Sequence, residues 1–293
     1  MGLSLISGST SREQALKCLE RLPAMSPMVT QLLSRLARGN CDVMELTALV
    51  EKDAVLSAQI LRLANSAFFA RAQPINSVKH AIAMVGVGAM RKFALGTSIS
   101  NLFSRFRVAP SFSMTRFNLH SVATGTLVEL ISDEVPLEDH NTAFIAGLLH
   151  DVGKLLIAIA MPKQYEDILG VAAVSGAPLW ECEREVLGTD HAELSSLAIS
   201  RWDLGESLRW AVCYHHEPER ARAVEQDRAG KLSLSLAIHR ADAFINSLGM
   251  SVCPAPPLCG AVSSLDFPGF SFSTQRVIQR FELELRGLTD LFR

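Results

Sequence analysis

The sequence lacks the paired cysteines that define a zinc ribbon. Its six cysteines are Cys18, Cys41, Cys182, Cys213, Cys253 and Cys259, and no two of them form a CxxC pair. A zinc ribbon needs two such closely spaced pairs. In a chain of 293 residues we therefore expect reduced, mostly buried thiols.

The sequence also lacks an excess of either charge. Its 28 Lys and Arg residues nearly balance its 30 Asp and Glu residues, and the formal net charge is −2. Such a balance provides no general attraction to nucleic acid or to an acidic membrane. Neither is therefore expected as a partner of this protein.

Membrane-spanning and targeting segments are not evident. No apolar run approaches the roughly 20 residues of a membrane span, and the run LLIAIAM is far shorter. The stretch MGLSLISGSTSREQ has neither the charged n-region nor the apolar h-region of a signal peptide. Ile6 stands where myristoylation prefers Ser or Thr. We expect a cytoplasmic protein.

Apolar residues with helical spacing are abundant. They make up 48% of the chain and the mean hydropathy is +0.22, which indicates a globular protein with a sizeable core. Asp42 precedes a helical stripe that includes Leu46 and Val50, and a second stripe includes Leu56 and Ile60. Alternating patterns with Gly-rich hairpin turns are absent from the sequence. The pattern predicts an all-α fold.

Breaks in the helical pattern suggest three parts. The stretch RFRVAPSFSM, residues 105 to 114, separates an N-terminal helical lobe (residues 1–107) from a second lobe (residues 108–250). The last part (residues 251–293) begins with prolines that break helix, namely Pro254, Pro256, Pro257 and Pro268. A final helix follows, with Val277, Phe281, Leu285, Leu288 and Phe292 on one side. We favour packing of this helix onto the body; a homodimer through it stays an open alternative.

Histidines and aspartates recur on the apolar faces of the predicted helices. His120, His191, His215 and Asp242 each share a helix face with aliphatic residues, and the stretch AGLLHDVGK ends an apolar run with His150 and Asp151. Five helices would thus direct ligand-type side chains toward one interior. Imidazoles and carboxylates are ligands of Fe, Mn, Zn and Mg, and a buried carboxylate needs a positive partner.

Each of these histidines, taken singly, is more often a core or surface residue than a ligand, and we leave His80, His140 and His239 in that class. His215 and His216 are adjacent, so on a helix they would project about 100° apart. They could serve two ions, or one ion and one substrate phosphate. Asp190 and Glu193 are typical of a helix start at His191.

From about Leu22 to Asp242 the chain resembles the HDOD family, within the HD superfamily of helical metal-dependent phosphohydrolases. The N-terminal part of the match consists of LPAMSPMVTQLL, LVEKDAVLSAQILRLANSAFF and PINSVKHAIAMVGVGAMRKFAL. The second part consists of HDVGKLL, EREVLGTDHAELSSLAISRW and YHHEPE, in the order and spacing of that family. The resemblance implies an all-α protein whose N-terminal lobe packs on an HD-type helical bundle, acting as an output module in bacterial signalling.

The resemblance also implies a ligand set for divalent metal ions, two in number, with Fe, Mn, Ni, Zn and Mg not distinguished. The ligands would be His120, His150, Asp151, His191, His215, His216 and Asp242. Lys154 would contact a substrate phosphate, so that Lys154 and Asp151 would be the catalytic residues. HDOD domains have generally lost catalytic residues, whereas the superfamily pattern is nearly complete in this chain.

The stretch HDVGK is similar to the HD-GYP branch of cyclic-di-GMP phosphodiesterases. That branch has a Gly-Tyr-Pro motif after the double histidine, and HHEPERARAVEQDRAGK contains none. Arg116 also stands where that branch has a carboxylate, one turn before His120. A third metal is therefore not expected, and Arg116 could instead face an anion.

Three functions remain open on these residues. We favour a signalling output protein that recognises a partner protein or a small phosphate-containing ligand. The alternatives are an active metal-dependent phosphohydrolase or phosphodiesterase on a nucleotide-like substrate, and a non-catalytic protein-interaction module. The stretch SVKHAIAMVGVGAMRKFA has a glycine turn like that of a helix-turn-helix, but its few basic residues do not favour DNA binding.

Overall fold

The computed structural model describes residues 8–37, 42–65, 74–221, 230–253 and 265–289. Within these ranges the chain is helical, and the only β-type pairing is one isolated bridge between Leu137 and Leu232. The predicted all-α fold is confirmed. Cys41, Cys259, Pro254, Pro256, Pro257 and Phe292 lie outside the described residues, as does the side chain of Leu288.

The first helices follow the predicted stripes and caps. They are α1 (Gly8–Lys17), η1 (Cys18–Arg21), α2 (Pro27–Ala37), α3 (Val43–Val50), α4 (Ala54–Ala64), α5 (Val78–Val85) and α6 (Val87–Leu102). The Asp42 side chain accepts a hydrogen bond from the backbone N–H of Glu45, which caps α3. Gly86, with φ of 97°, lies between α5 and α6, where the chain bends by 117°.

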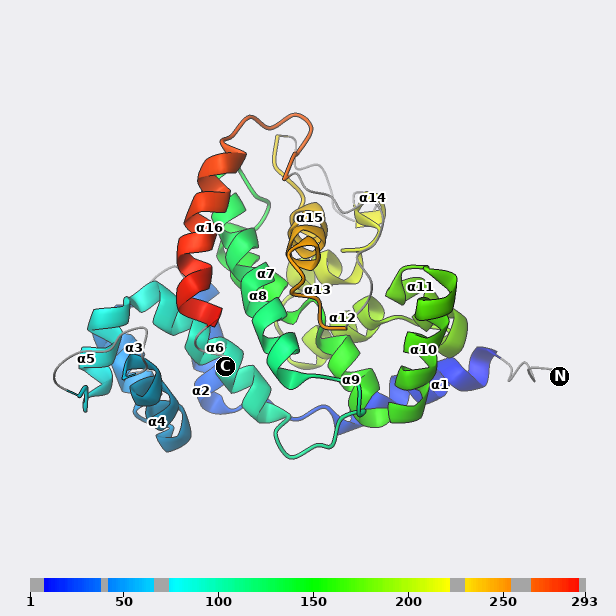
Figure 1. The fold of residues 1–293 in the computed structure, drawn as a ribbon, viewed down its shortest axis with the longest axis horizontal. Helices are drawn as coiled ribbons and strands as arrows, with labels where there is room; N and C mark the ends of the chain where they lie inside the picture. Colours follow the sequence, from blue (N-terminus) through cyan, green and yellow to red (C-terminus); the bar gives the residue numbers. More distant parts are fainter. Residues whose placement is uncertain (1–7, 38–41, 66–73, 222–229, 254–264, 290–293) are drawn as a thin grey trace.

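The later helices form the bundle that carries the ligand-type residues (Figure 1). They are α7 (Met114–Glu134), η2 (His140–Thr142), α8 (Ala143–Leu149), α9 (Val152–Ala160), α10 (Pro162–Ser175), α11 (Leu179–Leu187), α12 (His191–Arg201), α13 (Glu206–Cys213), α14 (Pro218–Ala221), α15 (Leu234–Ser247) and α16 (Thr274–Thr289). Helix α7 is the longest of them, and α8, α15 and α16 all contact it.

Two glycines allow α7 and α8 to approach each other closely. A Cβ atom added to Gly147 would lie 2.5 Å from the Cα atom of Gly125, and one added to Gly125 would lie 2.6 Å from the carbonyl oxygen of Phe144. Real Cβ contacts are longer than this, so both positions require glycine. The close contact brings the end of α8, and therefore His150 and Asp151, to the middle of α7.

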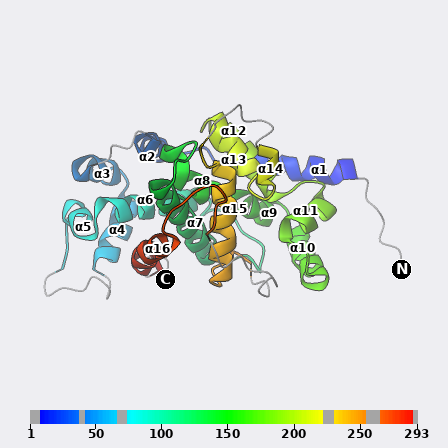
Figure 2. The ribbon, with the colours of Figure 1, turned by 90° about the horizontal axis from the view of Figure 1, so that it is seen from above.

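The N-terminal segment lies against the bundle. Helix α1 contacts α11, while η1 contacts α9 and α12; Figure 2 shows α1 at the opposite end of the molecule from α3, α4 and α5. The indole Nε1–H of Trp202 donates to the carbonyl oxygen of Pro23 at 3.0 Å, and Arg12 forms an ion pair with Glu193. The two-lobe division near residue 107 stays a prediction, and the first helix lies outside the cluster formed by α2–α5.

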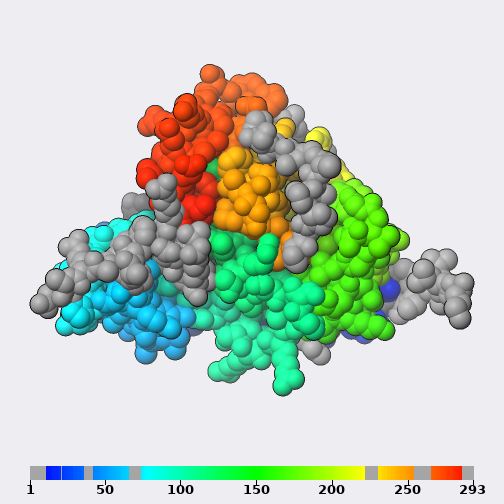
Figure 3. Space-filling model, viewed as in Figure 1, coloured from blue at the N-terminus to red at the C-terminus, as the bar shows by residue number. Residues whose placement is uncertain are grey.

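The last helix packs onto the body, in agreement with the favoured interpretation. Val277 and Phe281 are buried, and Phe281 contacts Phe244 of α15 with ring centroids 6.5 Å apart. Figure 3 shows α16 and α15 side by side on one face. The buried Lys92 of α6 forms ion pairs with Glu129 of α7 and Glu284 of α16, so one cation joins three helices.

The apolar character of the central helices is stronger than the short run LLIAIAM suggests. The stretch His140–Ala160 is long and apolar enough to cross a membrane, because η2, α8 and α9 follow one another with only His150 and Asp151 between α8 and α9. However, 94% of the most apolar 18-residue stretch of this segment is buried within the protein. Core helices show such burial.

The described cysteines are free thiols. Cys18, Cys182 and Cys253 are buried, and Cys213 is half-buried.

Candidate metal centre

The seven predicted ligand residues converge within the helical bundle. His120 lies in the middle of α7, His150 and Asp151 lie between α8 and α9, His191 is the first residue of α12, and Asp242 lies on α15. Their donor atoms form two groups, and within each group all the donor atoms lie within 4.8 Å of one another. Six of the seven residues are buried, and His216 is partly exposed.

The position of His215 and His216 differs from the prediction. They were expected on a helix, but α13 ends at Cys213 and both histidines lie in the turn that follows it. The backbone of Tyr214, with φ of −108° and ψ of 17°, has left the helical conformation, and the next helix, α14, begins at Pro218. The two imidazole rings still lie together, with centroids 3.9 Å apart.

The first group contains two histidines and two carboxylates: His120, His150, Asp151 and Asp242. The His120 Nε2 atom lies 3.1 Å from Asp242 Oδ1, 3.3 Å from Asp151 Oδ2 and 3.4 Å from His150 Nε2. Donors that each bind one ion at about 2 Å are separated by about 3 Å from one another. The spacing of this group therefore fits a divalent cation.

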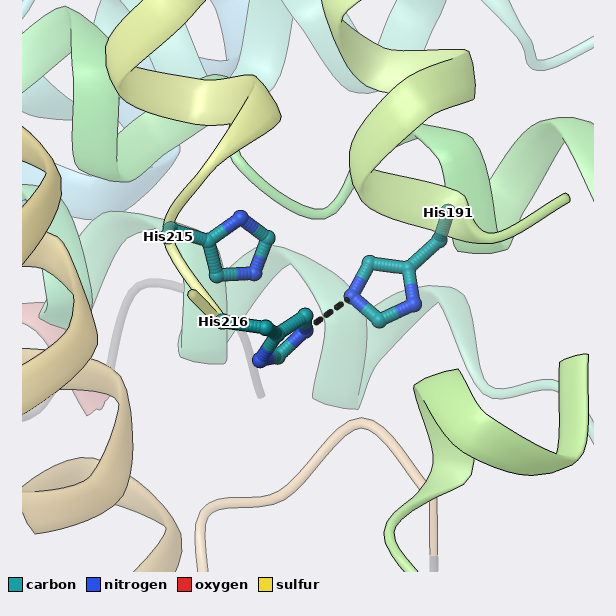
Figure 4. A group of neighbouring side chains, drawn as sticks. All are labelled: His191, His215 and His216. Carbon is teal, nitrogen blue, oxygen red and sulfur yellow. Dashed lines mark hydrogen bonds between the residues drawn. The ribbon is translucent and has the colours of Figure 1, made fainter. Parts of the chain in front are cut away.

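The second group contains three histidines, which Figure 4 shows around a common point. The Nε2 atoms of His191 and His216 are 2.8 Å apart. The Nε2 atom of His215 is buried and has no hydrogen-bond partner among the described residues. A buried polar nitrogen without a partner is costly, and a cation bound to these three nitrogens would remove that cost.

Asp151 lies between the two groups. Its Oδ2 atom faces His120, while its Oδ1 atom lies 3.2 Å from Nε2 of His191 and 3.4 Å from Nε2 of His150. This Oδ1 atom is also buried without a hydrogen-bond partner in the described structure. Oδ2 thus faces the first group, while Oδ1 lies between His150 of the first group and His191 of the second, so one carboxylate contacts both groups. A carboxylate shared by two neighbouring cations would have such a position.

Backbone carbonyls set the orientation of three of the imidazoles. The Nδ1–H of His120 donates to the carbonyl oxygen of Met250 at 3.0 Å. In the same way His150 donates to the carbonyl oxygen of Gly147 at 2.7 Å, and His215 donates to that of Val212 at 2.7 Å. With the proton on Nδ1, each Nε2 lone pair points into the centre, as a metal-ligating histidine requires. His239 supports this arrangement from outside the groups by donating to the carbonyl oxygen of His215.

Glu183 is a functional candidate that the sequence reasoning missed. It is only 1% exposed, and its Oε2 atom accepts hydrogen bonds from the Nδ1 atom of His191 at 2.6 Å and from the backbone N–H of His191 at 2.7 Å. A signal was available in the sequence, because Glu183 shares a helix face with the buried Leu187. An acidic residue on such a face needs a specific partner.

A comparison with protein families decides the identity of this bundle. A model of the HDOD domain matches residues 22–218, more than half of the chain. The chain belongs to the HDOD domain family. The curated relative that it matches, an uncharacterized protein of Treponema pallidum, is 21% identical over 204 residues, and the chain spans 38% of that protein's length.

Solved structures share the fold of this HDOD protein. An HDOD domain protein of unknown function from Geobacter sulfurreducens is 21% identical, with a TM-score of 0.71, over 96% of this chain and 99% of that chain. A protein from Marinobacter aquaeolei, provisionally named a signal transduction protein, is 16% identical, with a TM-score of 0.71; the match covers 99% of this chain and 67% of that chain. A provisionally named phosphohydrolase from Shewanella amazonensis is 20% identical, with a TM-score of 0.66; the match covers 95% of this chain and 96% of that chain. These TM-scores show a common fold.

Lys154 of the HDOD protein contacts the centre through Asp151. Its Nζ atom lies 2.7 Å from Asp151 Oδ2, and its side chain is 10% exposed. Burial alone would lower the pKa of Lys154, but the negative charges of Asp151 and Asp242 raise it above its ordinary value. The ammonium group is therefore charged at neutral pH. Of its three N–H donors, one is used by Asp151.

Arg116 does not take the anion-binding position that its place in the sequence allowed. Its Nε–H donates to the carbonyl oxygen of Ser251 at 2.9 Å, and one terminal nitrogen donates to the carbonyl oxygen of Gly249. These two carbonyls flank Met250, whose own carbonyl accepts from His120. Arg116 thus holds the backbone segment that orients His120.

The carboxylates strongly favour protonation of two imidazoles when no cation is bound. Burial alone would lower the pKa of His120, but hydrogen bonds to Asp151 and Asp242 raise it to about 9. Burial is likewise outweighed at His191, where the charge of Glu183 and the contact with Asp151 raise the pKa to about 9. A proton on His120 or His191 competes with a cation for the same Nε2 atom.

This competition predicts how metal-dependent stability changes with pH. A group whose pKa is raised in the folded state stabilises the metal-free protein below its unfolded pKa, and this contribution is lost as the pH rises through about 9. Over the same interval the cation meets less competition and binds more tightly. We expect the difference in Tm between metal-loaded and chelator-treated protein to widen from pH 7 to pH 9. A constant or narrowing difference would contradict this expectation.

Proposed function

We propose that this protein is a regulatory output module of bacterial signalling that holds two divalent cations in its second lobe. The observation that carries the proposal is the position of Asp151, whose carboxylate contacts both groups of donor atoms. Its buried Oδ1 atom and the buried Nε2 atom of His215 have no other partner among the described residues. Two cations would satisfy both atoms.

The regulatory role is supported by the helices that precede the bundle. The HDOD match includes these helices. None of the seven predicted ligands lies on them, so they serve a purpose other than supplying ligands to the metal centre. The centre is also nearly closed, since the side chains of Lys154 and Asp242 are only 10% and 11% exposed. We propose that it binds a partner protein or a small phosphate-containing ligand in the cytoplasm.

Hydrolysis of a phosphate ester is the second candidate function, and the complete ligand set supports it. The cations would acidify a water molecule and neutralise charge on a phosphoryl group. Asp151 would hold the two cations at a fixed separation. Lys154 has N–H donors beyond the one bound to Asp151, and these can reach toward a phosphoryl oxygen. A non-catalytic interaction module is the third candidate.

Metal analysis combined with an activity screen distinguishes these functions. The purified protein is reconstituted with Mn²⁺, Fe²⁺, Ni²⁺, Zn²⁺ or Mg²⁺, and its metal content is measured by elemental analysis. It is then tested against nucleotides, cyclic dinucleotides and a generic phosphodiester, with Asp151→Ala as the control. We expect about two ions per chain and no turnover above the control, as the regulatory role requires.

The other outcomes separate the alternatives. Turnover that is absent from the Asp151→Ala protein would make the phosphohydrolase the leading function. Absence of both bound metal and turnover would contradict the proposed centre and leave an interaction module.

A further inference from the structure

One face of α11 contacts the three-histidine group at several points. Trp180, Glu183 and Arg184 lie three and four residues apart, so that they share one side of this helix. The Trp180 ring stacks on the imidazole of His216, with centroids 5.6 Å apart and planes inclined by 13°. Helix α11 itself carries none of the predicted ligands, yet it touches two of the three histidines.

Glu183 fixes the imidazole of His191 in a position suited to a metal ligand. The two hydrogen bonds from His191 to Glu183 Oε2 hold both the ring and its backbone. They place the ring proton on Nδ1 and leave the Nε2 lone pair pointing to His216 and Asp151. A carboxylate bound to the outer nitrogen of a histidine also raises the basicity of the inner nitrogen.

Arg184 holds together the two backbone segments that carry the histidines. Its Nε–H donates to Asp190 Oδ2 at 2.6 Å, and a terminal nitrogen donates to Glu217 Oε2 at 2.6 Å. Asp190 immediately precedes His191, and Glu217 immediately follows His216. The guanidinium also lies over the Trp180 ring, 4.5 Å from its centroid. The separation of His191 and His216 thus depends on α11.

The two donor groups differ in chemistry. The three-histidine group offers three imidazoles and one oxygen of Asp151, whereas the other group offers two imidazoles and two carboxylates. Imidazole ligands suit Zn, Fe, Ni and similar transition cations, while carboxylates suit Mg and Mn. The two groups should therefore differ in the cations that they retain.

We propose that Glu183 is the positioning residue that makes the three-histidine group a separate site for a transition cation. This inference rests on the proposed function, because it assumes that the centre binds metal. Loss of the Glu183 carboxylate would weaken this one site and leave the site formed by His120, His150 and Asp242 in place. The centre would then bind one of its two cations less tightly.

Cobalt titration of the full chain tests this inference, because the visible spectrum of Co²⁺ reports the ligands and geometry of each site. The test variant is Glu183→Gln, which keeps the size of the side chain and one acceptor oxygen. Glu183→Ala removes both the bulk of the side chain and the acceptor oxygen. Glu185→Ala is the matched control, since Glu185 is an exposed carboxylate on the same helix.

We expect the wild type and Glu185→Ala to bind two Co²⁺ ions, one of which a large excess of Mg²⁺ does not displace. In Glu183→Gln we expect the affinity of that Mg²⁺-resistant site to fall about 10- to 100-fold, with a changed spectrum, while the other site is unaltered. Asp242→Asn should weaken the other site instead.

Two results would overturn the inference. If Glu183→Gln and Glu183→Ala both bind two Co²⁺ ions with the affinities and spectrum of the wild type, Glu183 has no positioning role and the proposed metal centre still stands. If the wild type binds no Co²⁺, the proposed centre and this inference are both wrong. Far-ultraviolet circular dichroism of each variant confirms that the comparison is between folded proteins.

Discussion

Substitution of Asp151 by alanine should remove both cations and leave Lys154 buried without its partner. Asp151 is completely buried and its carboxylate contacts both donor groups, so its loss removes a ligand from both sites. We expect the metal content of reconstituted protein to fall from about two ions per chain to the background of chelator-treated protein. Elemental analysis measures this directly.

The same substitution should destabilise the metal-free protein. Asp151 forms an ion pair with the buried Lys154 at 2.7 Å, and breaking a buried pair by removing one partner costs about 3–5 kcal/mol. Urea unfolding of chelator-treated protein measures the loss. The double variant Asp151→Ala/Lys154→Met should regain much of this free energy of unfolding without regaining metal. Retention of two ions by Asp151→Ala would show that the carboxylate does not join the sites.

Substitution of Gly153 by alanine should have the largest effect of any single methyl group in the bundle. A Cβ atom at this position would lie 2.1 Å from the carbonyl oxygen of His191, and the N–H of Gly153 donates to Ser195 Oγ at 2.8 Å. Backbone atoms cannot rotate away, so α9 and α12 must separate. We expect a loss of about 3 kcal/mol or more in the free energy of unfolding.

The Gly153 substitution should also weaken metal binding, because His191 begins the helix that is displaced. Gly170→Ala is the matched control: Gly170 lies within α10, and an added Cβ would meet nothing within 4 Å. Alanine there should stabilise the protein by about 0.5–1 kcal/mol. Urea unfolding of both variants provides the comparison. A loss below about 1 kcal/mol for Gly153→Ala would contradict the steric argument.

Local features of this fold can be predicted from the sequence. The caps at Asp42 and Asp190 depend on residues within three positions, and helical periodicity identifies the buried face on which His120 lies. A histidine on such a face points inward whatever its neighbours are. This is why the predicted ligand residues lie close together, even though their distances could not be foreseen.

Features that depend on distant segments could not be predicted in this way. The segment that Arg116 binds lies more than 130 residues further along the chain. The residues next to Arg116 therefore gave no indication that its guanidinium binds backbone carbonyls and not an anion. Glu183 acquires its role only when α11 lies against the start of α12. His215 and His216 were assigned to a helix because their neighbours have helical spacing, whereas α13 ends at Cys213 and both histidines lie in the turn that follows.

The docking of the N-terminal segment onto α11 and α12 has a consequence for biosynthesis. Arg12 and Leu19 find their partners Glu193 and Arg201 about 180 positions later. At a translation rate of about 5–20 residues per second, these partners emerge from the ribosome about 10–40 s after the segment itself. During that interval the apolar side chains of Ala15, Cys18 and Leu19, which are buried in the finished protein, lack the helices α11 and α12 that contact this segment in the native fold. Helix α1 thus reaches its native place only after α11 and α12 have been synthesised, although it precedes them by more than 160 residues.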